Sequence, residues 1–264
     1  MKQLLLTFLF TWWISLLYAQ SLLTPVGKYT GSGSYSRHFQ QLLSAWSNPA
    51  GLSCLSSLCA GIYAENRFML KDASLYVAMI AVPVHRGAFG GSIARLGNTA
   101  WHQQRMSGAY GMQVGKKAGI GLQFNYETIS VQGFGSTAKI SVDGGLLWHI
   151  SEQWHGGLHV YKPADAAIVY SGGLGFEASR DFLLTGEVIG MGTFTTVKAS
   201  AYYRIIRQLA LEIGVASGAA YNNAAVILFL RSLRIDIAAA FHPQLGITPA
   251  TSLVWQLSPS SPTE

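Results

Sequence analysis

Apolar and polar residues alternate at every second position along most of the chain, which is the period of a β-strand with two different faces. In residues 118–129, one face holds Leu122 and Phe124, and the other holds Gln123 and Asn125. Further clear examples lie at 137–150, 195–206 and 233–241. These segments do not follow the helical period of 3.6 residues, so the pattern predicts an all-β protein.

Residues typical of turns separate the alternating segments, and the chain is expected to form fourteen strands. A transmembrane strand needs about 9–11 tilted residues, which leaves roughly four residues for each connection. Long loops are therefore not expected, and the longest candidate is 130–136. The expected strands are 58–68, 73–84, 87–96, 100–112, 118–129, 137–150, 154–161, 166–177, 182–190, 195–206, 209–217, 222–231, 233–242 and 246–257.

The composition indicates a membrane protein that does not cross with helices. Of the 264 residues, 50% are hydrophobic and only 11% are charged, whereas soluble domains have about 25% charged residues. After residue 20 no apolar run reaches the 18 or so residues that a membrane helix needs. A closed antiparallel up-and-down transmembrane β-barrel, in contact with outer-membrane lipid, reconciles these two facts. The net charge of +6 is scattered along the chain, so no nucleic-acid partner is expected.

The first residues have the features of a secretory signal peptide. Lys2 precedes an apolar stretch at 4–17, and Ala19 offers a small residue for cleavage. We therefore expect a signal peptide at 1–19, although an uncleaved membrane anchor is the alternative. An even number of strands places both termini of a bacterial barrel in the periplasm, including the tail 258–264.

Residues 20–57 do not alternate and are expected to form an N-terminal plug or periplasmic segment. The spacing of Phe39, Leu42 and Trp46 predicts a short helix over 36–46, followed by a turn. Such a segment cannot lie in lipid with unpaired backbone groups, so it belongs inside the barrel or on its periplasmic rim. The strands 73–84 and 222–231 are apolar on both faces and must pack against something in the lumen. Aromatic residues expected to form girdles at the membrane interfaces are Trp101, Trp148, Trp154, Tyr170, Tyr203 and Trp255.

Both signs of charge occur at positions assigned to the lumen. One interpretation is a selective polar pore, which more often carries a one-sided ring of charge. The interpretation that we favour is a paired network that closes the lumen. The residues of this expected network are Glu127, Lys139, Asp143, Glu177, Glu187, Lys198, Arg204, Glu212, Arg234 and Asp236.

The sequence shows no catalytic or metal-binding constellation. His155 and His159 share one strand face, but four strand residues span about 13 Å, too far to hold one metal. The only cysteines, Cys54 and Cys59, could pair in an oxidising compartment or remain free. Ser and His residues form no grouping that would indicate a barrel hydrolase. We expect no enzyme activity, metal or cofactor, and the sequence does not locate a binding site.

The five residues Asn48, Pro49, Ala50, Gly51 and Leu52, just before the first strand, resemble the "NPAGL" element of FadL-type fourteen-stranded barrels. The nearer resemblance is to the PorV/PorQ branch, which also shares glycine-rich strands and a final strand similar to 242–255. The likeness extends over about residues 30–257. It implies a fourteen-stranded barrel with a plug motif at Asn48, Pro49, Ala50 and Gly51, and an association with type IX secretion.

Two functions follow as hypotheses. The first is a non-enzymatic structural or adaptor subunit of an outer-membrane assembly linked to type IX secretion, in a complex with other secretion or outer-membrane proteins. The resemblance, the balanced charges and the short connections favour it. The alternative is a passive channel or transporter for small or hydrophobic solutes, with the N-terminal segment as its plug.

Overall fold

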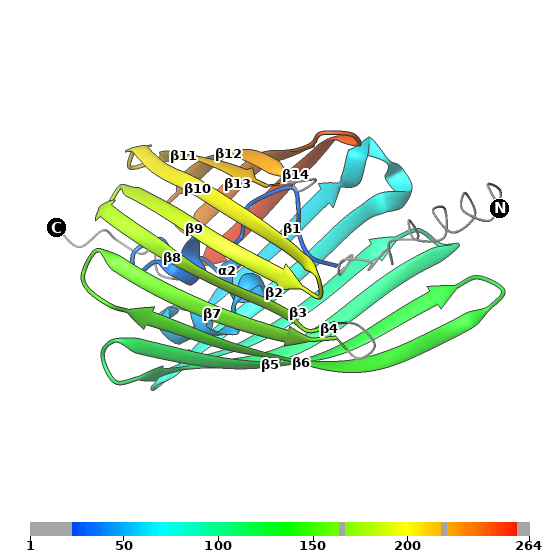
Figure 1. The fold of residues 1–264 in the computed structure, drawn as a ribbon, viewed down its shortest axis with the longest axis horizontal. Coiled ribbons are helices and arrows are strands. Elements are labelled where there is room, and N and C mark those ends of the chain that lie inside the picture. The colour runs from blue at the N-terminus through cyan, green and yellow to red at the C-terminus, as the bar shows by residue number, and fades with distance from the viewer. Residues whose placement is uncertain (1–22, 164–166, 218–220, 258–264) are drawn as a thin grey trace, which may run out of the picture.

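A computed structural model shows a closed barrel of fourteen antiparallel β-strands, so the predicted fold class is confirmed (Figure 1). Each strand pairs with its neighbours in the chain, and β1 pairs with β14 to close the barrel. The structure describes residues 23–163, 167–217 and 221–257. The predicted signal peptide 1–19 and the tail 258–264 lie outside the described residues. The strands are β1 (Cys59–Asn66), β2 (Ser74–Val84), β3 (Gly87–Gly97), β4 (Trp101–Val114), β5 (Ala118–Val131), β6 (Gly135–His149), β7 (Trp154–Lys162), β8 (Val169–Ser179), β9 (Phe182–Met191), β10 (Phe194–Ile206), β11 (Leu209–Ala216), β12 (Asn222–Leu230), β13 (Leu233–His242) and β14 (Gly246–Gln256).

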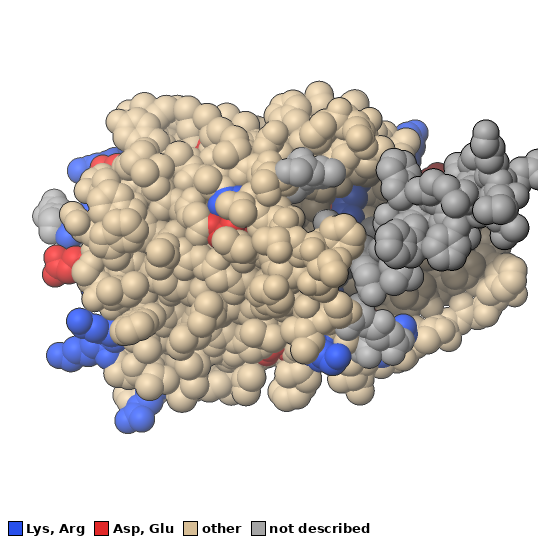
Figure 2. Space-filling view, in the orientation of Figure 1, with Lys and Arg blue, Asp and Glu red and all other residues tan. Residues whose placement is uncertain are grey.

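The outer face of the barrel is apolar because the alternation of the sequence turns one side of each strand outward. In β5, Leu122 and Phe124 are 57% and 61% exposed, whereas Gln123 and Asn125 between them are buried. Figure 2 shows an outer wall that is mostly uncharged, with most charged side chains near its two ends. Such a surface is stable in lipid rather than in water.

Most of the aromatic residues expected at the interfaces do face outward near strand ends. Trp148, Trp154, Tyr170 and Tyr203 are each about half exposed, and Trp255 is 38% exposed. The expectation for Trp101 is wrong. This residue occupies an inward position of β4 and packs against the apolar cluster that contains Leu96 and Trp46.

The barrel has a terminal end, at which β1 begins and β14 ends. The opposite end is called the distal end. The connection expected to be longest, 130–136, is a short turn, because β5 and β6 continue to Val131 and Gly135. The distal connection between β1 and β2 is longer and contains the 3₁₀-helices η3 (Arg67–Met69) and η4 (Lys71–Ala73).

Residues 23–58, called the N-terminal segment below, run inside the barrel from the distal toward the terminal end (Figure 1). They contain the short helices η1 (Ser32–Tyr35), α2 (Ser44–Ser47) and η2 (Pro49–Cys54). The helix predicted over 36–46 is wrong except for its last turn. The N–H groups of Arg37 and His38 donate to the Glu177 carboxylate instead, and residues 36–43 adopt no helix. Among the described residues, no helix is long and apolar enough to cross a membrane.

Apolar side chains of the N-terminal segment pack against the inner wall. Leu23, Leu43 and Trp46 contact Leu75 and Val77 of β2. This contact accounts for the apolar inward face of β2 that the sequence displayed. Another cluster joins one residue of the segment to β9, β10, β11 and β12. Its buried members are Phe39, Leu183, Tyr202, Ala210 and Ile227.

Candidate functional site: the N-terminal segment and the inner wall

Five buried carboxylates on the inner wall contact the N-terminal segment in turn. They lie on β1, β13, β11, β9 and β8, which follow one another around the barrel with at most one strand between consecutive members. As the chain proceeds from Val26 to His38, its contacts move along this arc, except that Tyr29 reaches ahead to Glu187. We call these residues the carboxylate row: Glu65, Asp236, Glu212, Glu187 and Glu177.

The first contact of the row joins Glu65 to the backbone. The N–H groups of Val26 and Gly27 donate to Glu65 Oε2 at 2.9 and 2.7 Å. Arg67 Nε donates to Glu65 Oε1 at 2.7 Å, and its guanidinium also donates to the carbonyl oxygen of Thr24. One buried carboxylate thus receives two backbone donors and one cation, which compensates the cost of removing it from water.

Asp236 forms an ion pair with Lys28, which is the only lysine of the described N-terminal segment. Lys28 Nζ donates to Asp236 Oδ2, and Arg234 Nε donates to Oδ1 at 2.8 Å. Ser252 of β14 donates to the same carboxylate at 2.7 Å. Burial lowers the pKa of Lys28, while the charge of Asp236 acts in the opposite direction. Removing one partner of such a pair would leave a buried charge without compensation.

Hydroxyl groups make the next contacts. Ser32 Oγ donates to Glu212 Oε1. Tyr35 Oη donates to Glu187 Oε1 at 2.7 Å, and Tyr29 Oη donates to Oε2 of the same residue at 3.3 Å. Burial, reinforced by the negative charge of Glu187, raises the pKa of both tyrosines well above its usual value. Both phenols therefore remain protonated and able to donate.

Glu177 ends the row near the terminal end. It accepts from the N–H groups of Arg37 and His38, and His38 Nδ1 lies 2.5 Å from its Oε2. His155 Nε2 lies 3.3 Å from its Oε1, and His155 Nδ1 lies 3.0 Å from His149 Nδ1. Among the described residues, no group of three or more His, Cys, Asp or Glu side chains is arranged to hold a metal ion.

The motif that carried the family resemblance lies against the opposite side of the wall. Asn48 Nδ2 lies 3.2 Å from the carbonyl oxygens of both Leu146 and Leu158, on β6 and β7. Its Oδ1 accepts from the N–H of Ala50 at 2.9 Å and so caps η2, where Pro49 occupies the first position. Asn48 therefore both starts the helix and binds it to the wall.

Inward glycines allow this motif to approach the wall closely. A Cβ atom on Gly121 would lie 2.3 Å from the carbonyl carbon of Pro49, and one on Gly145 would lie 1.9 Å from Asn48 Oδ1. At Gly121 a side chain would require a shift of the η2 backbone, and at Gly145 it would displace the Asn48 amide from its position. We call the four glycines beneath η2 the glycine floor: Gly111, Gly119, Gly121 and Gly145.

The remaining expected lumen charges lie elsewhere on the wall. Glu127 accepts from Arg105 Nε at 2.7 Å and from Tyr161 Oη at 2.8 Å. Asp143 accepts from Gln123 and Asn125. In strand register, Lys139 lies opposite Glu127, and Lys198 lies opposite Glu187. Arg204 Nη1 lies 3.8 Å from Asp181, which is an exposed residue of a terminal-end turn.

The structure thus divides the ten expected charges between two settings. Four of them, Glu177, Glu187, Glu212 and Asp236, contact the N-terminal segment. The fifth member of the row, Glu65, was missed, although it occupies an inward position in the alternation of β1. The segment's own partners, such as Lys28 and Tyr35, carry no periodic signal. Cys54 and Cys59 are both free thiols.

No protein-family profile matches the sequence, and no curated protein matches it either. Solved structures do match. A FadL homologue of Pseudomonas aeruginosa superposes with a TM-score of 0.60 at 12% identity, covering 89% of this chain and 98% of that chain. The Ralstonia pickettii toluene transporter TbuX gives 0.63 at 10% identity, covering 89% and 97%. The monoaromatic hydrocarbon channel CymD gives 0.62 at 10% identity, covering 91% and 99%.

The likeness shows a FadL-type fold. The part of the predicted resemblance that concerns FadL-type barrels is therefore confirmed at the level of fold. These neighbours do not support the PorV/PorQ branch or a link with type IX secretion. Two of these neighbours are described as a monoaromatic hydrocarbon channel and a toluene transporter.

Proposed function

We propose that this protein is a passive outer-membrane channel for small apolar solutes and that its N-terminal segment is a displaceable plug. The observation that carries the proposal is the path of the segment. It contacts the carboxylate row from β1 to β8 and then the glycine floor on β4, β5 and β6. A segment that follows the inner wall this far occupies the route through the barrel.

The chemistry of the contacts favours displacement over permanent closure. The carboxylate row pairs with the segment through hydrogen bonds and ions, all of which water can replace if the lumen becomes hydrated. Apolar side chains would be sufficient to fill a lumen that stays permanently closed. Such a filling would avoid the free-energy cost of removing charged groups from water. The segment is also not joined to the wall by a disulfide, since Cys54 and Cys59 are free.

The class of solute follows from what the segment covers. Leu43 and Trp46 cover an apolar area of β2 and β3 that includes Leu75, Val77 and Leu96. Displacement of the segment would expose this area to a solute of matching chemistry. The similar folds of a monoaromatic hydrocarbon channel and a toluene transporter support the same class.

The first test is uptake of an apolar fluorescent probe, 1-N-phenylnaphthylamine, by intact bacteria that carry the protein in their outer membrane. Apolar probes of this kind cross an intact outer membrane slowly, so a channel should raise the initial rate of uptake. The control is the same strain with an unrelated closed barrel at equal abundance. Equal rates in the two strains would contradict the proposal.

The adaptor hypothesis remains a proposal that rests on the sequence resemblance, the balanced lumenal charges and the short connections. It predicts that the protein, extracted from its native membrane in mild detergent, carries a second outer-membrane or secretion protein at fixed stoichiometry. The orientation with both termini in the periplasm is likewise a proposal. Protease protection of a tag after residue 264 in intact cells would test it.

A further inference from the structure

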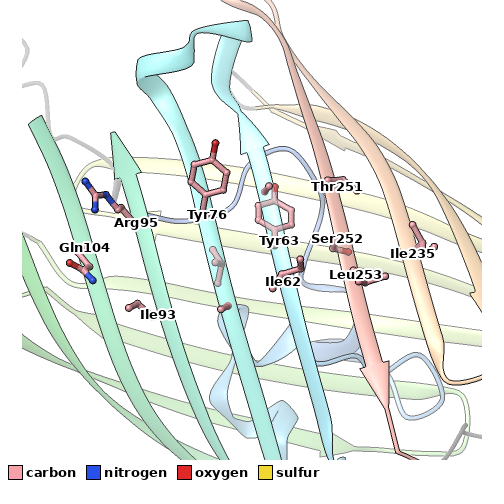
Figure 3. A pocket seen from close by; sticks show the side chains of 13 residues that line it. Ile62, Tyr63, Tyr76, Ile93, Arg95, Gln104, Ile235, Thr251, Ser252 and Leu253 are labelled. Carbon is pink, nitrogen blue, oxygen red and sulfur yellow. The ribbon is translucent and has the colours of Figure 1, made fainter. Parts of the chain in front are cut away.

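A groove of ≈ 600 Å³ lies on the outer wall, away from the N-terminal segment (Figure 3). It crosses β14, β1, β2 and β3, and residues of β13 and β4 border it. Ile62 and Tyr76 in its lining are 58% and 59% exposed, so the groove opens outward. It therefore faces the hydrocarbon of the membrane rather than the lumen.

One row of outward residues along the groove is mostly polar. Strand register places Thr251, Ala64, Tyr76, Arg95 and Gln104 side by side on five consecutive strands. The row continues beyond the groove to Thr128 and Ala138 on β5 and β6. On β2, β3 and β4 this row gives the groove a polar boundary toward the distal end.

The next row toward the terminal end is apolar. It contains Leu253, Ile62, Ala78 and Ile93, again in register on consecutive strands. The small side chain of Ala78 lies between the larger Ile62 and Ile93, which leaves the wall hollow at this point. The groove thus has a mostly polar edge toward the distal end and an apolar floor.

Arg95 is an unusual residue for this surface. Only two Lys, Arg, Asp or Glu residues occupy outward positions of the described strands. They are Arg95 and Lys162, the last residue of β7. A cation on the lipid face is costly unless it reaches the headgroup level and finds an anion. Arg95 lies two residues before the distal end of β3, with Tyr76 and Gln104 as its neighbours in register. A guanidinium binds phosphate through two parallel hydrogen bonds.

We propose that this groove binds one anionic, phosphate-bearing lipid, with its phosphate at Arg95 and an acyl chain along the apolar row. Charge complementarity favours this occupant, because Arg95 supplies the cation and Tyr76 and Gln104 supply further hydrogen-bonding groups. The site lies outside the lumen and does not depend on the proposed channel function.

The test is native mass spectrometry of the full chain in mild detergent, titrated with phosphatidylglycerol or with phosphatidylcholine. Wild type should retain one phosphatidylglycerol and bind phosphatidylcholine more weakly. Arg95→Gln should weaken phosphatidylglycerol binding about tenfold. The matched control is Arg86→Gln, which removes an exposed cation from the terminal-end turn before the same strand and should bind as wild type does.

A second variant tests the apolar row. Ala78→Phe fills the hollow on the outer face without altering any charge, and it should also reduce phosphatidylglycerol binding. Heat-modifiable gel migration verifies that each variant is a folded barrel. Equal retention by wild type and Arg95→Gln would overturn the proposal. So would retention of the two lipids without preference, or a dimer that excludes lipid and is lost in Ala78→Phe.

Discussion

At the scale of single residues, each carboxylate of the row is buried and yet has donors of identified chemistry. Glu187 accepts from two phenols, and Glu65 accepts from two backbone N–H groups and an arginine. A buried carboxylate without such donors would be strongly destabilising. The contacts between segment and wall therefore depend on a few polar side chains of the segment.

Tyr35 provides a direct measure of one such contact. Tyr35→Phe removes the hydroxyl that donates to Glu187 and keeps the ring that packs beside Gly157 and Gly173. We expect the free energy of unfolding to fall by about 1–3 kcal/mol, because Glu187 loses its shorter hydrogen bond. Urea unfolding in detergent micelles measures it. The control Tyr126→Phe, on the outward face of β5, should change little, and equal losses in both variants would contradict this role of Tyr35.

Asn48 tests the motif at the same scale. Asn48→Asp keeps the acceptor that caps η2 but removes the two donors to the carbonyl oxygens of Leu146 and Leu158. The new charge would face two carbonyl oxygens, so we expect faster proteolysis of the N-terminal segment in the folded barrel. Asn98→Asp alters an exposed turn cap at the distal end and serves as control. Unchanged proteolysis of the segment in Asn48→Asp would contradict the assignment.

At the scale of elements, the alternation of the sequence was sufficient to predict the strands, because lipid outside and a polar interior impose opposite faces on every strand. The segment 36–46 was mispredicted because its apolar spacing fits a helix, whereas its backbone donors bind Glu177 on a distant strand. A sequence pattern reports which side chains share a face. It does not report which backbone groups find partners elsewhere.

The glycine floor makes a prediction about elements. Gly111→Ala would place a Cβ 2.6 Å from the Cβ of Leu52 and 2.7 Å from the backbone nitrogen of Ser53, so it should displace η2 from β4. Gly108→Ala lies on the same strand with no atom within 4 Å of the added Cβ. We expect a lower unfolding temperature and a more protease-sensitive segment in Gly111→Ala alone. Identical behaviour of the two variants would show that η2 does not need this close approach.

At the scale of the whole molecule, the sequence predicted a barrel and a segment inside it or on its periplasmic rim, but not the path of that segment. The path depends on contacts between residues far apart in the chain, such as Lys28 with Asp236 and Ser32 with Glu212. Asp236 and Glu212 were predicted as lumenal charges from the alternation of their strands. It could not assign their partners, since nothing in residues 20–57 repeats with a period that reports contact with a strand.

The central claim is that the N-terminal segment closes the barrel, and single-channel conductance in planar bilayers tests it most directly. The variant Lys28→Ala, Ser32→Ala, Tyr35→Ala removes donors to three carboxylates and leaves the wall unchanged. The control Thr24→Ala, Gln40→Ala, Ser56→Ala alters three side chains of the segment that make no contact with the carboxylate row. Wild type and control should remain closed for most of the time, and the first variant should show frequent or long openings. Equal conductance in all three proteins would contradict the claim.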